Sequence, residues 1–330
     1  MKRKVIRQGH NTLTITLPSK WVKEFNLVSG QEIDLTEKDN GLFLSTQKNE
    51  GIRRTEFSLE GMDIPTIWKY FMSAYREGYD EIVVRFKPNT IMDSPYRFFT
   101  AYSDDVSYAK ERRKKPIIEA LHKFIYRFIG MEIVEQGEGY VLIKEMGEAT
   151  SKEFDNSLRR IFLLLQEMAE RISESIEKEN PKLVANMHET DINLDKFHDY
   201  CIRVLNKTGY KDSRASNLLF AMLFMLELLG DEFKAIAKHL YHDFPKEKFP
   251  NLKPVTSNVK KQVDLFYNLY YKFDKEKILE ISKLDAETHS ELFHSKTNKA
   301  TSAEKSIFNH LRRISRYMNS LTELRIEMEF

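Results

Sequence analysis

The chain has 330 residues, and because domains typically span ~100–200 residues, we expect two or three domains. Hydrophobic residues make up 41% and charged residues 31%, which supplies buried cores and excludes a disordered chain. The formal net charge is only +2, so charge-driven binding depends on where the charges lie. The single cysteine, Cys201, excludes a disulfide framework and a cysteine zinc cluster. No apolar run reaches the ~20 residues of a membrane span, so we expect a cytoplasmic protein without membrane insertion.

Residues 1–47 predict short strands around one short helix. Residues 13–17 alternate apolar side chains with threonines, as in a half-buried strand. A Pro-Ser pair then opens a helix at 20–25, since proline suits a first helical turn. Residues 32–36 and 42–46 predict a hairpin across an Asn-Gly turn. A unit of this size holds little core alone, so we expect it to dimerise.

Residues 52–146 predict a small α/β sandwich, because helices and strands alternate along them. The expected strands lie at 54–59, 81–86, 131–135 and 140–144, and the expected helices at 64–77 and 116–128. The basic run at residues 112–115 opens the second of these helices, and we interpret it as a helix-start face. The pattern predicts no role for this domain.

From residue 151 onward the pattern is helical throughout. Apolar residues recur at i, i+3, i+4 and i+7 in the first helix, at Leu158, Ile161, Phe162, Leu165, Met168, Ala169, Ile172 and Ile176. A Pro-containing break at 244–254 divides the region into residues 151–245 and 253–330, each long enough for three helices. The predicted fold class is therefore multi-domain α+β, ending in mainly α tandem three-helix bundles.

The first candidate site is a basic cluster near the N-terminus. Residues 1–23 contain no acid and six cations, which are Lys2, Arg3, Lys4, Arg7, Lys20 and Lys23. Doubled in a dimer, these cations would neutralise several phosphates of a duplex. Gln8, His10, Asn11 and Thr12 would add hydrogen bonds to base edges. The alternative interpretation is a solvated basic face.

The same segment resembles a known family. Arg3-Lys4-Val5, Gly9, Leu-Thr-Ile-Thr-Leu-Pro at 13–18 and Lys20-Trp21-Val22 are similar to the SpoVT/AbrB swapped-hairpin family, and to its archaeal members in particular. The resemblance implies a homodimer with interleaved hairpins that binds DNA. The residues it implies for DNA contact are Arg3, Lys4, Arg7, Lys20 and Lys23. Gln31 stands where the family usually has aspartate, which removes a polar anchor from the turn.

The second candidate site consists of acid pairs on consecutive helices. Asp191 and Asp195 are spaced i, i+4, with Asp199 one turn further, and Glu227 and Asp231 repeat the spacing. Like charges at this spacing repel, so a cation or a basic partner between the helices would stabilise them. The alternative is an exposed acidic ridge paired with lysines. Iron or zinc would be plausible with His188 or His198 nearby.

These acids also carry a resemblance to the PhoU family of phosphate-uptake regulators. The matching stretches are 187–195 and 226–231, and the tandem bundles agree with it. The resemblance implies a metal ion, divalent or iron-type, bound by Asp191, Asp195, Glu227 and Asp231. It also implies a phosphate ABC transporter and a signalling kinase as partners.

The second half departs from that pattern. Asp285 and His289 take the places of the first acid pair, but Arg312 and Arg316 replace both acids of the following helix. A cation site there is in doubt. The arginines would pair with Asp285 or Glu287 across the bundle, or would receive an anion or an acidic partner.

Taken together, these features predict a DNA-binding transcriptional regulator of phosphate uptake or homeostasis, with a metal-binding PhoU-like region for sensing or docking. The alternative is a PhoU-type adaptor that binds a phosphate ABC transporter and uses residues 1–47 for dimerisation. A carboxylate-bridged metalloenzyme ranks low, because neither acid pair has the Glu-x-x-His spacing of di-iron bundles. We therefore expect no enzymatic activity.

Overall fold

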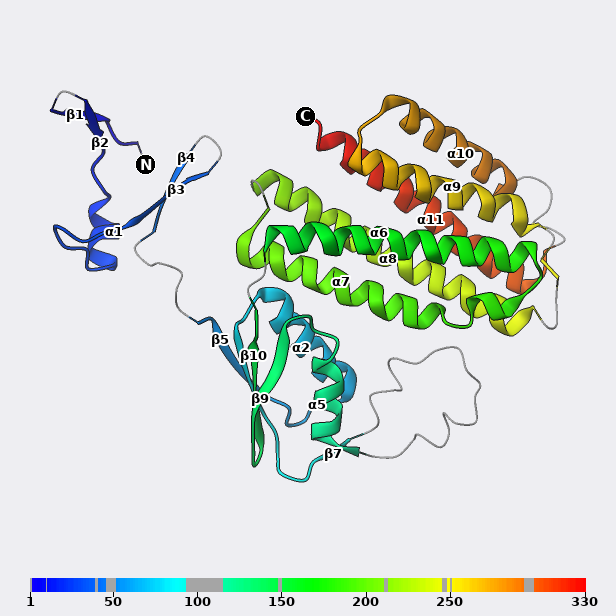
Figure 1. Ribbon diagram of the computed structural model, residues 1–330, viewed down its shortest axis with the longest axis horizontal. Coiled ribbons are helices and arrows are strands. Elements are labelled where there is room, and N and C mark those ends of the chain that lie inside the picture. The colour runs from blue at the N-terminus through cyan, green and yellow to red at the C-terminus, as the bar shows by residue number, and fades with distance from the viewer. Residues whose placement is uncertain are drawn as a thin grey trace. The chain divides into compact units, whose positions relative to one another are not determined.

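The computed structural model describes residues 2–9, 11–38, 41–45, 52–92, 115–147, 150–210, 213–244, 248–249, 251–293 and 300–330. His10 and residues 112–114 of the predicted basic run lie outside these ranges. The chain divides into two compact units, Met1–Ile52 and Arg53–Phe330 (Figure 1). In the described part of the chain, no helix has both the length and the apolar character that a membrane crossing requires.

The first unit is built from two hairpins and a short helix, as predicted. Strands β1 (Ile6–Gln8) and β2 (Thr12–Thr14) pair antiparallel, followed by α1 (Ser19–Glu24). Strands β3 (Asp34–Lys38) and β4 (Gly41–Ser45) form the second antiparallel pair. The strand predicted at 13–17 ends earlier, at Thr14. Thr14 pairs with Ile6, the first residue of β1, so the residues after Thr14 have no strand to pair with.

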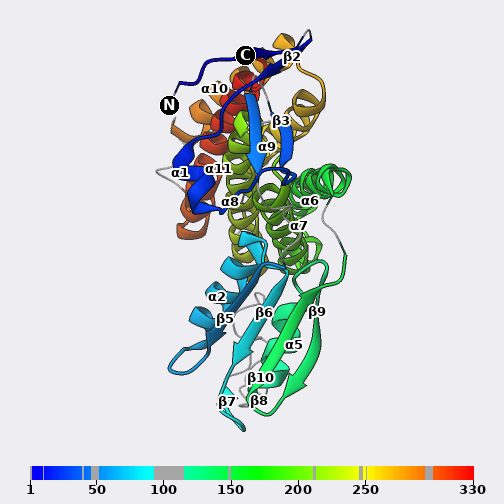
Figure 2. The same cartoon turned by 90° about the vertical axis from the view of Figure 1, so that its left-hand side faces the viewer.

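A two-layer α/β sandwich opens the second unit. The sheet has the order β5-β6-β10-β9, with β5 (Arg54–Ser58) parallel to β6 (Glu81–Arg85). The other two pairings, of β10 (Tyr140–Glu145) with β6 and with β9 (Met131–Gly137), are antiparallel. Helices α2 (Ile64–Glu77) and α5 (Ile117–Ile125) cover one face (Figure 2). Short strands β7 (Ile91–Met92) and β8 (Lys115–Pro116) pair beside α5.

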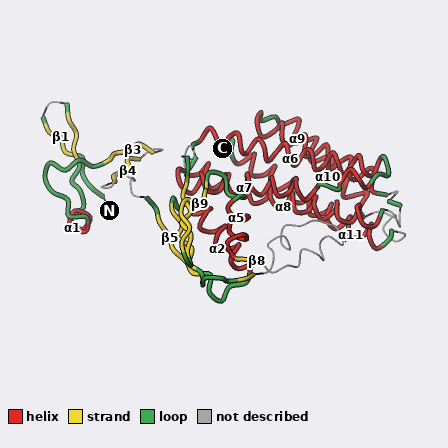
Figure 3. Tube along the Cα trace, turned by 60° about the horizontal axis from the view of Figure 1, so that its bottom comes forward, coloured by secondary structure: helices red, strands yellow, loops and turns green. Residues whose placement is uncertain are grey.

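Six long helices follow in the described chain (Figure 3). They are α6 (Ser151–Glu177), α7 (Met187–Thr208), α8 (Ser213–Asp243), α9 (Leu252–Tyr271), α10 (Lys275–Phe293) and α11 (Ser302–Glu327), with a 3₁₀ turn, η1, at Pro181–Val184. Thr150 and Glu153 form a capping box that starts α6. Helices α6, α7 and α8 contact one another, as do α9, α10 and α11, and the two triplets join through α8 with α11 and α6 with α9.

The apolar stripe predicted on the first helix is confirmed. All eight of its side chains on α6 are buried, with at most 6% of each exposed. The buried residues of the sandwich and of the helices form one continuous apolar cluster. The sandwich and the helical region therefore share a core, which explains why residues 53–330 form one compact unit.

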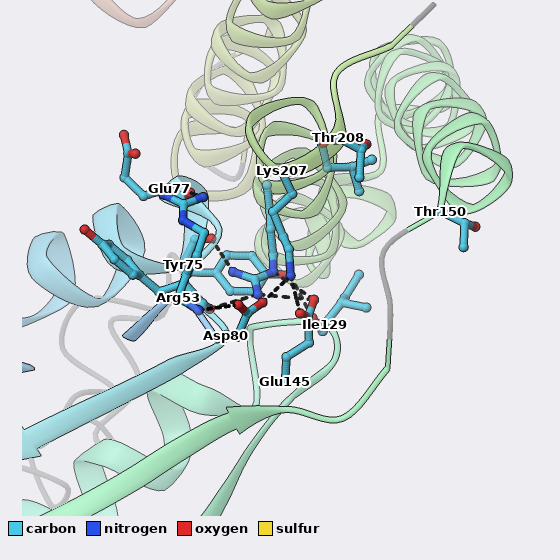
Figure 4. A network of polar contacts seen from close by, with 12 residues as sticks. Arg53, Tyr75, Glu77, Asp80, Ile129, Glu145, Thr150, Lys207 and Thr208 are labelled. Atoms are coloured by element: carbon cyan, nitrogen blue, oxygen red, sulfur yellow. Dashed lines mark hydrogen bonds and ion pairs between the residues drawn. The ribbon is translucent and has the colours of Figure 1, made fainter. Parts of the chain in front are cut away.

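Two basic side chains of α7 fasten that helix to the sandwich. Arg203 is fully buried and donates hydrogen bonds to the carbonyl oxygens of Tyr75, at 2.8 Å, and Tyr79, at 2.9 Å. Lys207 forms ion pairs with Asp80, at 2.5 Å, and with Glu145 (Figure 4). Because these contacts come from both layers of the sandwich, they fix its position against α7.

Candidate nucleic-acid interface and buried acidic cluster

The basic residues of the first unit are all open to solvent. Arg7 lies on β1, Lys20 and Lys23 lie on α1, and Arg3 and Lys4 precede β1. Each of these five side chains is exposed, and no other described residue forms an ion pair with any of them. Exposed cations without local partners are available to the phosphates of a nucleic acid.

The first unit also lacks a core of its own. No described residue between 2 and 45 whose side chain the structure describes is buried. Several large apolar side chains are strongly exposed, among them Leu13 at 68%, Val28 at 70% and Phe43 at 63%. Exposed apolar surface of this extent on so small a unit is typical of an interaction surface.

The acidic cluster lies where α7 and α8 cross closely. Gly230 of α8 permits this approach, because a Cβ atom there would lie only 3.0 Å from the Cδ1 atom of Leu194 on α7. The crossing brings Asp191 of α7 and Asp231 of α8 to the same ammonium group. Lys234 Nζ lies 2.6 Å from Asp191 Oδ2 and also forms an ion pair with Asp231.

The other acids of α7 are paired with arginines of the sandwich. Arg127, which follows α5, lies 2.9 Å from Asp195, through its Nη2 and the Oδ2 atom. Arg76 of α2 donates from Nε to Asp199 Oδ1 at 2.7 Å. Although burial alone would raise it, hydrogen bonds from His198 and Arg76 hold the pKa of Asp199 below its usual value. Sequence reasoning missed both arginines, which are distant along the chain, whereas Lys234 lies one turn after Asp231.

Glu227 differs from its neighbours, because no described residue pairs with it. Burial, followed by the nearby charges of Asp231 and Asp195, raises the pKa of Glu227 to about 7. Burial, with the charges of Lys234 and Arg127, lowers the pKa of His188 to about 4. His188 is therefore neutral near pH 7, whereas Glu227 gains or loses its proton close to that pH.

Glu227, Asp195 and Asp199 share a cavity of about 260 Å³ with the two arginines. Its apolar walls come from Trp68, Met72 and Phe224, so it lies between α2, α7 and α8. Carboxylates of this kind suit a hard cation, and Asp191 Oδ1 is buried without a hydrogen-bond partner. As arranged here, however, the described residues contain no group of three or more ligands that would hold a metal ion.

The second triplet repeats this crossing with neutral partners. Asp285 of α10 accepts hydrogen bonds from Ser315 and, at 2.9 Å, from Asn319 Nδ2 on α11. Arg312 instead donates to the carbonyl oxygen of Leu292 at 3.0 Å. The contacts of Asp285 that the structure describes are therefore with hydroxyl and amide donors of α11, while the pairing of the arginines with Asp285 or Glu287 stays a prediction.

One comparison with known proteins bears on the first unit. A family model described as "Antidote-toxin recognition MazE, bacterial antitoxin" matches residues 6–51. This match agrees with the swapped-hairpin resemblance of the first unit. It covers nearly all of Met1–Ile52 and none of Arg53–Phe330. No curated protein compared with the chain matches it.

Proposed function

We propose that this chain is a DNA-binding transcriptional regulator that acts as a homodimer. The family match over residues 6–51 carries this proposal, since it coincides with the unit that holds the exposed cations. The residues proposed for DNA contact are Arg3, Lys4, Arg7, Lys20 and Lys23. Their charges would neutralise backbone phosphates and set the register on the duplex, while base-edge contacts would select the sequence.

Dimerisation follows from the missing core of the first unit. Its exposed apolar side chains would gain burial against a second chain, and an interleaved pair of hairpins would supply that contact. Dimerisation would also double the number of cations on the DNA-binding surface. Salt dependence of binding grows with the number of neutralised phosphates, so the dimer would bind more tightly and be more sensitive to salt.

We further propose that the helical region is a PhoU-like sensing or docking module for phosphate homeostasis. Two observations support this. The first is that the six helices form two triplets. The second is that the Lys234–Asp191 contact of the first triplet and the Asn319–Asp285 contact of the second occupy equivalent places. A metal at Asp191, Asp195, Glu227 and Asp231 stays a prediction. Its binding requires Lys234 and Arg127 to withdraw from the carboxylates, and a bound ion would then supply the neutralising charge.

A salt titration of DNA binding tests the regulator proposal. The intact chain is compared with an Arg3/Lys4/Arg7→Ala variant on mixed duplex fragments. The variant loses six cations per dimer, so the slope of log K against log salt becomes shallower by up to about 5. A Lys253/Lys283/Lys305→Ala variant is the matched control, because it removes the same charge from exposed positions of the helices. Equal slopes for all three proteins would contradict the proposal.

The adaptor function is the second candidate, and the same titration separates it from the first. An adaptor uses the first unit for dimerisation alone, so the intact chain would bind no DNA even at low salt. The first unit would still dimerise, which sedimentation of the same samples measures. A transporter ATPase of a phosphate ABC system, or a signalling kinase, would then be the partner to test.

A further inference from the structure

A second, larger cavity opens at one end of the helical region. Its volume is about 570 Å³, within the ~300–1,000 Å³ range of small-molecule sites. The walls come from the starts of α6 and α8 and from the ends of α9 and α11. These are elements of both triplets, so the cavity lies at the junction between them. Nothing in the proposed function uses it.

The cavity has aromatic and aliphatic walls. Tyr210, Tyr270 and Tyr271 line it, together with Leu158, Leu218 and Leu219. Burial raises the pKa of Tyr270, so its side chain stays an uncharged hydroxyl. No described residue hydrogen-bonds to that hydroxyl. The tyrosine rings can stack against a flat ring of a ligand, because aromatic stacking tolerates many ring types.

The two arginines of the cavity differ in whether a carboxylate pairs with them. Arg325 Nη1 pairs with Glu329 Oε1 at 2.6 Å, so those two charges balance each other. Arg214 Nη2 donates to the carbonyl oxygen of Glu327, at 2.8 Å. Among the described residues no carboxylate pairs with Arg214. Its guanidinium charge is therefore free to receive an anion from solution.

One carboxylate of the cavity retains acceptor capacity. Asp155 Oδ1 accepts a hydrogen bond from the Tyr210 hydroxyl at 2.8 Å, and the carboxylate is otherwise exposed. A carboxylate accepts further hydrogen bonds at its second oxygen. Sugar hydroxyls are common donors to such a group in nucleotide sites. The cavity thus combines ring faces, an acceptor for hydroxyls and a cation for an anionic group.

We propose that this cavity binds a nucleoside monophosphate. The base lies against the tyrosines, a sugar hydroxyl donates to Asp155, and the phosphate pairs with Arg214. The site belongs to the helical unit, so the proposal does not rest on DNA binding by the first unit. A ligand held at the junction of the two triplets would bind most tightly to one arrangement of them.

Titration calorimetry of the full chain with AMP, GMP, CMP and UMP tests this proposal. Adenosine and inorganic phosphate are the control fragments, because adenosine has the ring without the anion and phosphate has the anion without the ring. At least one monophosphate binds at least about tenfold more tightly than either fragment, because it makes both sets of contacts. Failure of all four to bind, or binding no tighter than that of phosphate, overturns the proposal.

Two variants locate the site. Arg214→Ala and Tyr271→Ala each weaken binding by about tenfold, since each removes one class of contact. Arg316→Ala on α11 and Tyr241→Ala on α8 are the matched controls, because both residues are exposed and lie outside the cavity. Circular dichroism checks that every variant folds. Unchanged affinity in the first two variants, or an equal loss in the controls, contradicts this location. Neither outcome affects the DNA titration.

Discussion

Individual carboxylates of the acidic cluster differ in how the protein satisfies them. Asp191 shares the ammonium group of Lys234 with Asp231, whereas Asp195 and Asp199 each have an arginine from the sandwich. Glu227 is half-buried beside them with no basic partner among the described residues. A half-buried carboxylate without a partner holds its proton more tightly than it does in the unfolded chain.

The stability of the protein should therefore depend on the protonation of Glu227. Its pKa rises from 4.5 in the unfolded chain to about 7 in the folded one, so folding favours the protonated form. The stabilisation is present below pH 4.5 and is lost as the pH rises through 7. Discounted for partial exposure, we expect a loss of about 2 kcal/mol in the free energy of unfolding.

Urea unfolding at pH 5 and pH 8, in the presence of a chelator, measures this loss. The wild type should lose about 2 kcal/mol more between the two pH values than Glu227→Gln, which cannot titrate. Glu280→Gln, at an exposed position of α10, is the control and should behave like the wild type. An identical loss in the wild type and in Glu227→Gln would show that Glu227 does not titrate in this range.

At the scale of elements, α7 is the helix that organises the second unit. One side contacts α6 and α8, where Gly230 permits close approach, and another contacts α2 of the sandwich. Arg203 lies at this second contact, with its guanidinium 5.0 Å from the centre of the Tyr75 ring. Its guanidinium donates hydrogen bonds to two backbone carbonyls and to Glu145.

Replacing Arg203 with methionine should therefore destabilise the second unit strongly. Methionine preserves much of the volume but removes the guanidinium donors from the carbonyl oxygens of Tyr75 and Tyr79 and the positive charge beside Glu145. Breaking a buried charged contact typically costs about 3–5 kcal/mol, so the urea midpoint should fall clearly. Arg171→Met on α6 removes a partly exposed i, i+4 ion pair and should cost at most about 1 kcal/mol. Equal effects of the two substitutions would refute this role of Arg203.

At the scale of the whole molecule, the two units should differ in how they fold. Residues 53–330 share one buried core, whereas the first unit buries no described side chain. The larger unit should therefore fold alone, and the smaller one should fold as it associates. This difference gives the chain two transitions of different kinds.

Thermal melts of the fragments 1–52 and 53–330 at two protein concentrations check this expectation. The midpoint of fragment 53–330 should stay constant, because its folding needs no partner. The midpoint of fragment 1–52 should rise by several degrees for about a tenfold increase in concentration, since dimerisation stabilises it by mass action. A concentration-independent melt of fragment 1–52 would indicate that the monomer folds alone.

Much of the fold follows from local sequence patterns. The 3.6-residue spacing of Leu158 to Ile176 gave the buried face of α6, and alternating elements gave the sandwich. The break predicted at 244–254 likewise marks the junction of α8 and α9, although α9 already begins at Leu252. These features were predictable because each depends on residues within one or two turns of the chain. The end of β2 was not, because a strand ends where its hydrogen-bonding neighbour does.

By itself, the sequence determined the elements, the basic N-terminal segment and the placement of acids on facing turns of two helices. Only the tertiary structure decided what those acids contact: Arg76 and Arg127 reach them from another layer, from positions far along the chain. It also decided that Arg312 donates a hydrogen bond to the carbonyl oxygen of Leu292, while Asn319 donates one to Asp285. Hydrogen bonds and ion pairs act over a few ångströms of space, so partners distant in sequence appear only once the chain is folded.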